Sequence, residues 1–122
     1  MTNKEKFLGE FEQFLLLGIL KLKDKAYGAS IRQLLSEVIE RDVSIGAMYT
    51  TLERLENKGL VNSRVGEATA ERGGRAKKYF SVTAKGQKAL RRSKNALGLM
   101  WQGLALKDEL SLTKLELKSH CG

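Results

Sequence analysis

Residues 44–59 read SIGAMYTTLERLENKG, and this stretch decides the fold. Its apolar side chains recur at spacings of three and four residues, at Ile45, Met48, Tyr49, Leu52 and Leu55. This spacing predicts a helix that is buried along one side. Ser44 is suited to cap the start of the helix, and Gly59 is suited to end it.

A second helical pattern precedes this one. Residues 26–28 read AYG, and the apolar residues after them follow the same spacings, at Ile31, Leu34, Leu35, Val38 and Ile39. The short connection 41–43 joins the two patterns. Two helices joined by a short turn predict a helix-turn-helix.

The period changes after Gly59. Two short segments rich in β-branched and aromatic residues, 60–65 and 78–82, predict a hairpin. The loop between them contains Arg72, Gly73, Gly74 and Arg75, which predicts a basic tip that bends easily. Such arginines suit the negative potential of a DNA minor groove, although a surface turn without a partner has the same composition.

The first and last helical patterns point to a second copy of the chain. From Leu8 to Leu22 the apolar residues cover nearly every side of a helix, and such a helix must be buried on every side. Because one small domain covers a single face, we expect another copy to cover the rest. Thr83 is suited to cap a last helix with a weak heptad seam, formed by Gly86, Leu90, Ser93, Leu97, Met100 and Leu104.

The positive charge lies in the second half of the chain. The net charge is +8 over 122 residues, a length typical of a single domain. Residues 1–60 carry equal numbers of basic and acidic side chains, so the whole excess falls within residues 61–122. A local excess of this kind indicates a polyanionic partner, although a solvated basic face kept for solubility is the alternative.

Several classes of protein are excluded. The longest run without a polar side chain, residues 14–20, is far shorter than the ~20 residues of a membrane-spanning helix. No secretory signal is evident at the start, so we expect a cytoplasmic protein. Cys121 and His120 are the only residues of their types, which leaves no internal disulfide, metal site or cofactor to expect. The acidic residues are scattered, and nothing resembles a catalytic site, so we expect no enzyme.

The polar side of the 44–59 helix suits DNA. Gly46 and Ala47 are small enough to let the start of the helix approach a groove, where Ser44 and free backbone N–H groups can hold a phosphate. Thr50 and Arg54 lie on the same side and can contact base edges. At the border of the buried side, the hydroxyl of Tyr49 can reach the DNA backbone.

The order and spacing of these motifs resemble the PadR-type family of bacterial winged helix-turn-helix transcriptional regulators. The resemblance covers roughly residues 8–104. It is carried by LGEFEQ at 8–13, AYG at 26–28, DVSIGAMYTTL at 42–52, RLENKGLV at 54–61, ERGGRAKKYF at 71–80 and TAKG at 83–86. Where members often read YGYEI, this chain has YGASI at 27–31, and little of it remains after Leu104, as in the short class of the family.

The resemblance implies a mainly α fold with a small β-hairpin wing. It divides the chain into a winged helix-turn-helix DNA-binding domain at 1–83, a dimerisation helix at 84–106 and a short helix or flexible tail at 107–122. It further implies a homodimeric repressor bound to a palindromic operator in double-stranded DNA. The implied contacts are Ser44, Ala47, Tyr49, Thr50 and Arg54 in the recognition helix and Arg72, Arg75 and Lys77 in the wing, with Gly46, Gly73 and Gly74 on the same surface.

A ligand at the dimer interface is also implied, because in similar short members small aromatic or cationic compounds can occupy it. We expect this interface to include Phe11, Leu15, Leu97, Met100, Trp101 and Leu104. Trp101 would stack on such a compound, although it would equally serve as dimer core. Two other functions stay open: an adaptor that binds a protein or acidic surface without reading DNA sequence, and an RNA-binding module.

Overall fold

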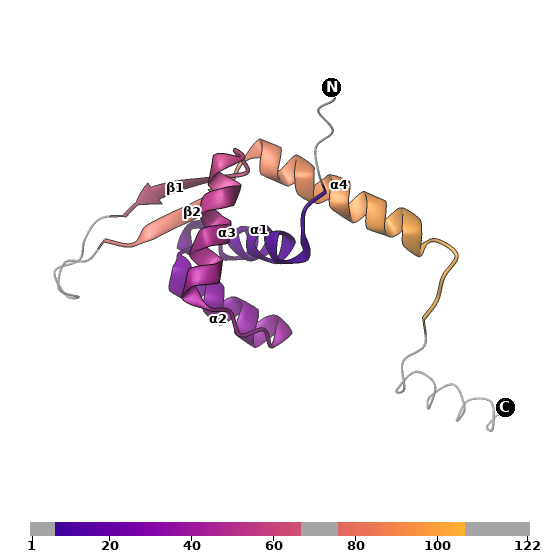
Figure 1. The fold of residues 1–122 in the computed structure, drawn as a ribbon, viewed down its shortest axis with the longest axis horizontal. Helices are drawn as coiled ribbons and strands as arrows, with labels where there is room; N and C mark the ends of the chain where they lie inside the picture. The colour runs from indigo at the N-terminus through magenta and orange to yellow at the C-terminus, as the bar shows by residue number, and fades with distance from the viewer. Residues whose placement is uncertain (1–6, 67–75, 107–122) are drawn as a thin grey trace.

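The computed structural model describes residues 7–66 and 76–106 (Figure 1). Its elements are α1 (Glu10–Leu22), a short 3-10 helix η1 (Lys23–Lys25), α2 (Gly28–Ile39), α3 (Ile45–Asn57), β1 (Val61–Val65), β2 (Lys78–Val82) and α4 (Ala84–Trp101). The predicted helix-turn-helix and hairpin are therefore confirmed. The basic tip residues 71–75 and the tail 107–122 lie outside the described residues.

The predicted helix caps at Ser44 and Thr83 and the predicted helix end at Gly59 are present in the structure. The Oγ of Ser44 accepts a hydrogen bond from the backbone N of Ala47 at 3.1 Å and caps α3. Gly59 follows the end of α3 with φ of 79°, a left-handed conformation that glycine adopts without strain. Thr83 caps α4 through a 3.0 Å bond from the N of Gly86 to its Oγ1.

The hairpin also pairs with a third stretch of backbone, residues 26–27 before α2. β1 and β2 pair antiparallel, with Val61 opposite Val82 and Arg64 opposite Tyr79. On the free edge of β2, the N of Phe80 donates to the carbonyl oxygen of Ala26 at 2.8 Å. An isolated bridge pairs residue 27 with residue 79 beside it, so the start of α2 is attached directly to the hairpin.

One core joins the three helices and the hairpin. It contains Leu15, Leu16 and Ile19 of α1, Ile31 and Leu35 of α2, Met48, Leu52 and Leu55 of α3 and Phe80 of β2. The expected burial of Ile45 is wrong, because this side chain is 55% exposed. It stands at the first residue of α3, and the core covers that helix only from Met48 onward.

α1 is apolar on every side but is not covered on every side by its own chain. Leu16 and Ile19 are buried, whereas Leu17 is 45% exposed and Leu20 is 38% exposed. The helix therefore keeps an uncovered apolar strip next to its buried one. This is the arrangement expected of a helix that needs a second partner.

The seam predicted along α4 divides into two parts. Gly86 and Ser93 are buried and Leu90 is partly buried against the core of the same chain, so the first half of the seam is an internal contact. Leu97 and Met100 are exposed. Leu104 lies beyond the end of the helix at Trp101, so its place in a helical seam is corrected. Figure 1 shows the second half of α4 extending away from the other helices.

No helix within residues 7–66 and 76–106 is long and apolar enough to cross a membrane.

Candidate nucleic-acid interface

The exposed side of α3 carries the residues expected to read DNA. Ala47, Thr50 and Arg54 are all exposed, while the core residues of the helix point to its other side. At Gly46 an added Cβ would have nothing within 4 Å, so the start of this helix has open space in front of it. Thr51 is buried and does not belong to this exposed side, and its hydroxyl donates a hydrogen bond to the Ala47 carbonyl oxygen at 2.9 Å.

Tyr49 connects α3 to α2. Its side chain is 42% exposed. Its ring edge and hydroxyl lie against Gly28, where an added Cβ would overlap both. Gly28 is thus the residue that lets the two helices of the pair approach each other.

The root of the hairpin is held by cations stacked on tyrosines. The Nζ of Lys77 lies 4.1 Å from the ring centroid of Tyr27, and the guanidinium of Arg64 lies 4.7 Å from that of Tyr79. The two rings meet edge to face, with centroids 5.5 Å apart. Contacts of this kind contribute about 0.5–1 kcal/mol each at exposed sites. Of these cations the sequence motifs indicated Lys77 alone; Arg64 lies on the same face of the hairpin as Tyr79 because the two residues are directly opposite each other in the antiparallel pair.

An apolar groove separates α1 from α4. It is lined by Leu17 and Leu20 from α1 and by Leu97 and Trp101 from α4 and has a volume of about 550 Å³. Four of the predicted interface residues do not line this groove, and one of them, Met100, is exposed on α4. Leu15 is completely buried in its own core, so its assignment to an interface is wrong; Phe11 is partly buried against that core, and Leu104 lies past the helix.

The reason for the error at Leu15 is that α1 is apolar all round. The sequence pattern therefore gives no indication of which side faces the core. Leu17 and Leu20 were the residues missed, and no signal in the sequence singles them out, because only packing decides which strip of α1 is buried.

A polar cluster ties α1 to the far end of α3. The carboxylate of Glu12 accepts from the backbone N of Gly9 at 2.8 Å and pairs with the Nζ of Lys58 at 3.0 Å. The Nζ of Lys85 donates to the Lys58 carbonyl oxygen at 3.0 Å, and the hydroxyl of Thr83 donates to the Gly59 carbonyl oxygen at 2.7 Å. These bonds link the end of α3 to the start of α4.

Partial burial by itself raises the pKa of Glu12. The hydrogen bond from Gly9 and the ion pair with Lys58 outweigh that effect and hold the pKa below its ordinary value of 4.5. Because the folded pKa is the lower one, the charged carboxylate stabilises the fold above pH 4.5. That contribution is lost as the pH falls through the folded pKa.

We therefore expect Glu12→Gln to lower the free energy of unfolding by about 1 kcal/mol at pH 7, with the difference from the wild type shrinking below pH 4.5. Urea unfolding at a series of pH values measures this. Glu10→Gln is the matched control, because Glu10 pairs with Arg41 at 2.9 Å but its side chain is 75% exposed, and a change under about 0.5 kcal/mol is expected. A difference for Glu12→Gln that stays constant with pH would contradict the assignment.

No candidate metal ligand set of three or more His, Cys, Asp or Glu side chains occurs among the residues that the structure covers. Cys121 and His120 are not among those residues.

The part of the chain that forms these elements is similar to a known protein family. The family described as the transcriptional regulator PadR-like family matches residues 16–92, from α1 into α4. No curated protein sequence matches the chain significantly.

Solved structures agree with the family match. A PadR-like transcription factor from Bacteroides fragilis is 28% identical, with 74% of this chain and 82% of that chain covered and a TM-score of 0.62. A PadR family transcription regulator from Clostridium difficile is 25% identical over 92% of this chain and 99% of that one, with a TM-score of 0.54. A PadR-like transcriptional regulator from Bacillus cereus shares the fold at 24% identity, covering 74% and 82% of the two chains with a TM-score of 0.61. The chain belongs to the PadR-like family of transcriptional regulators, which act by binding DNA and are not enzymes.

Proposed function

We propose that this protein is a dimeric repressor that blocks transcription by occupying a palindromic operator. Residues 1–83 form its DNA-binding domain, and residues 84–106 supply the dimerisation helix. Each subunit places α3 in a major groove, with the hairpin along the neighbouring minor groove. Contacts to phosphates supply most of the affinity.

The observation that carries this proposal is the exposed side of α3. Ala47, Thr50 and Arg54 form one open strip along a helix whose other side is anchored in the core. A rigid helix with a small residue at its start and an arginine further along suits a groove. Ser44, Gly46 and Tyr49 border the strip, and the tip residues Arg72, Gly73, Gly74 and Arg75 extend the proposed contact with Lys77.

The dimer is supported by the apolar surface of α1 and α4. Leu17 and Leu20 lie across a groove from Leu97 and Trp101, and Met100 is 75% exposed nearby. A contiguous apolar surface of this kind marks an interaction site. Two copies that cover it with each other would set the spacing of the two recognition helices, which a palindromic operator requires.

The direct test is to incubate the protein with sheared genomic DNA from its source at near-physiological salt, then recover and sequence the bound fraction. Enrichment of one or a few intergenic palindromes supports a specific regulator. A flat profile, with binding that vanishes as the salt concentration rises, favours the adaptor that does not read sequence.

Two substitutions separate base reading from phosphate contact. We expect Arg54→Ala to weaken operator binding more than binding to random duplex, by about 1–3 kcal/mol, because a guanidinium contact with a base is lost. Lys77→Ala should weaken both by the same factor and lower the salt slope by about one. Affinities for both duplexes across a salt series measure this, and equal losses for the two variants would remove Arg54 from base reading.

An effector in the apolar groove is expected to stack on the single tryptophan. Trp101 lines the groove and is 46% exposed, so a planar aromatic compound bound there should quench its fluorescence. Titration of a panel of such compounds measures this. Trp101→Ala should abolish their binding while leaving the dimer intact, and no quenching across a broad panel would assign Trp101 to dimer core alone.

A further inference from the structure

Only the inner half of the hairpin is covered by the core. On the side of the strands that faces the core, Val61 and Phe80 are buried, whereas Val65, further along the same side, is exposed. Figure 1 shows the two strands extending past α3 and away from the helices. Because apolar packing stops part of the way along the strands, the direction of the outer half depends on other contacts.

Glu56 meets the hairpin at the point where the core ends. It lies in the last turn of α3, and its Oε2 accepts a hydrogen bond from the hydroxyl of Ser63 at 2.7 Å. Its Oε1 lies 3.9 Å from the Nζ of Lys78. Ser63 is on β1 and Lys78 is on β2, both on the side that carries Phe80. One carboxylate therefore attaches both strands to α3.

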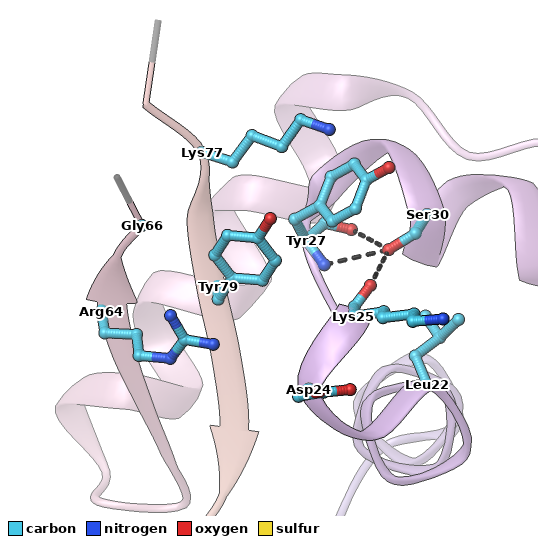
Figure 2. Close-up of a pocket in the computed structure, with 9 residues that line it drawn as sticks. All are labelled: Leu22, Asp24, Lys25, Tyr27, Ser30, Arg64, Gly66, Lys77 and Tyr79. Atoms are coloured by element: carbon cyan, nitrogen blue, oxygen red, sulfur yellow. Dashed lines mark hydrogen bonds between the residues drawn. The ribbon is translucent and has the colours of Figure 1, made fainter. Parts of the chain in front are cut away.

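The other attachments of the hairpin lead to the start of α2. The N of Phe80 donates to the carbonyl oxygen of Ala26 at 2.8 Å. The rings of Tyr27 and Tyr79 meet edge to face, with centroids 5.5 Å apart (Figure 2). Among residues 7–66 and 76–106, the bond from Ser63 to Glu56 is the only side-chain hydrogen bond between α3 and the two strands.

A carboxylate at this place does not suit direct contact with DNA. Glu56 is on the helix that we propose to enter a groove, and its charge repels phosphate groups. A favourable effect of Glu56 on DNA binding therefore acts through the strands that it holds.

We propose that Glu56 is a positioning residue for DNA binding, which holds the hairpin in a fixed direction relative to α3. This inference rests on the proposed function, in which α3 occupies a major groove and the hairpin lies along the neighbouring minor groove. The two elements contact one duplex together when their spacing matches that of the grooves. A hairpin that is held before binding avoids the entropy cost of being ordered on the DNA.

One arm of the test uses the free protein. Residual dipolar couplings of the backbone N–H groups, measured on the isotope-labelled full chain, report the directions of α3 and the hairpin in a common frame. We expect both elements of the wild type to fit one alignment. Glu56→Ala should reduce the couplings of residues 63–65 and 78–80 and retain those of α3.

The other arm measures affinity for the operator and for a random duplex. Removal of an acid by itself strengthens binding to both, so a loss has the opposite sign to the charge effect. We expect Glu56→Ala to weaken operator binding by about 10-fold, because the hairpin must then be ordered on the DNA. Ser63→Ala should have the same effect, with no further loss in the double variant. Binding to the random duplex should not weaken, since it requires no fixed spacing.

Two variants separate positioning from charge. Glu56→Gln removes the charge but keeps an acceptor oxygen for Ser63, so it should retain the couplings and the operator affinity. Glu53→Ala removes an equal charge from the same helix. Glu53 is exposed and forms no hydrogen bond or ion pair with any residue that the structure describes, so its loss should weaken binding to neither duplex. Thermal melting at one protein concentration shows that each variant is folded.

Three results would each overturn the proposal: unchanged couplings in Glu56→Ala, operator binding by Glu56→Ala that is as tight as that of the wild type, or an equal loss in Glu53→Ala. Failure of the wild type to select any DNA sequence would count against the proposed repressor. The couplings of the free protein would still decide whether Glu56 holds the hairpin.

Discussion

Gly86→Ala is expected to lower the free energy of unfolding by about 2–3 kcal/mol, although alanine is the better helix former. Gly86 lies in the first turn of α4, where the helix crosses the chain between α3 and β1. An added Cβ would collide with the carbonyl oxygen of Leu60 and approach the Cγ1 of Val82 to 2.7 Å. Because Leu60 contributes backbone atoms, the obstacle cannot be relieved by a rotamer change.

The control for this substitution is Gly46→Ala. Gly46 also lies in a helix, but an added Cβ there has nothing within 4 Å. The free energy of unfolding should rise by a few tenths to about 1 kcal/mol, because the unfolded chain loses freedom and helix propensity improves. Urea unfolding at one fixed protein concentration measures both, since the proposed dimerisation would make stability depend on concentration. If Gly86→Ala is neutral, α4 does not pack closely on residue 60.

Leu97→Glu is expected to convert the proposed dimer into a monomer and to weaken operator binding by about 100-fold or more. The substitution places a charge in the apolar groove opposite Leu17 and Leu20, where a second copy would bury it without a partner. Two linked recognition helices gain about 10²–10⁴-fold over one by effective concentration, and a monomer loses that gain. Sedimentation and operator titration measure the two effects.

The matched control is Asn95→Glu, which introduces the same charge on the other side of α4, at an exposed position outside the groove. It should leave both the dimer and the operator affinity intact. Affinity for a half-site duplex shows whether the variant is still folded, because the Leu97→Glu monomer should bind this duplex as tightly as the wild type does. A Leu97→Glu protein that stays dimeric would show that this groove is not the interface.

Most elements of the fold could be predicted from sequence features that extend over only a few residues. Ser44, Gly59 and Thr83 mark the ends of helices through hydrogen bonds and backbone angles that involve residues close in sequence. Enrichment in β-branched and aromatic residues placed the hairpin at 60–65 and 78–82, and the structure has β1 and β2 there. The exposed side of α3 also follows from the sequence, because a helix with a single apolar stripe has only one way to face a core.

Other features could not be deduced in this way. α1 is apolar all round, so only packing decides that Leu15 is buried and Leu17 is exposed. The seam of α4 looks continuous in the sequence, but its first half packs on its own chain because Gly86 allows close contact with Leu60.

The sequence by itself determined the order of the elements, their caps, the basic second half and the strip of α3 that faces outward. Each of these depends on neighbours within a few residues or on composition. Only the tertiary structure decided which apolar faces remain open and that Tyr27 meets Tyr79 at the root of the hairpin. Those two residues are far apart along the chain and meet because the Ala26–Phe80 hydrogen bond joins the start of α2 to β2, a contact that no local pattern specifies.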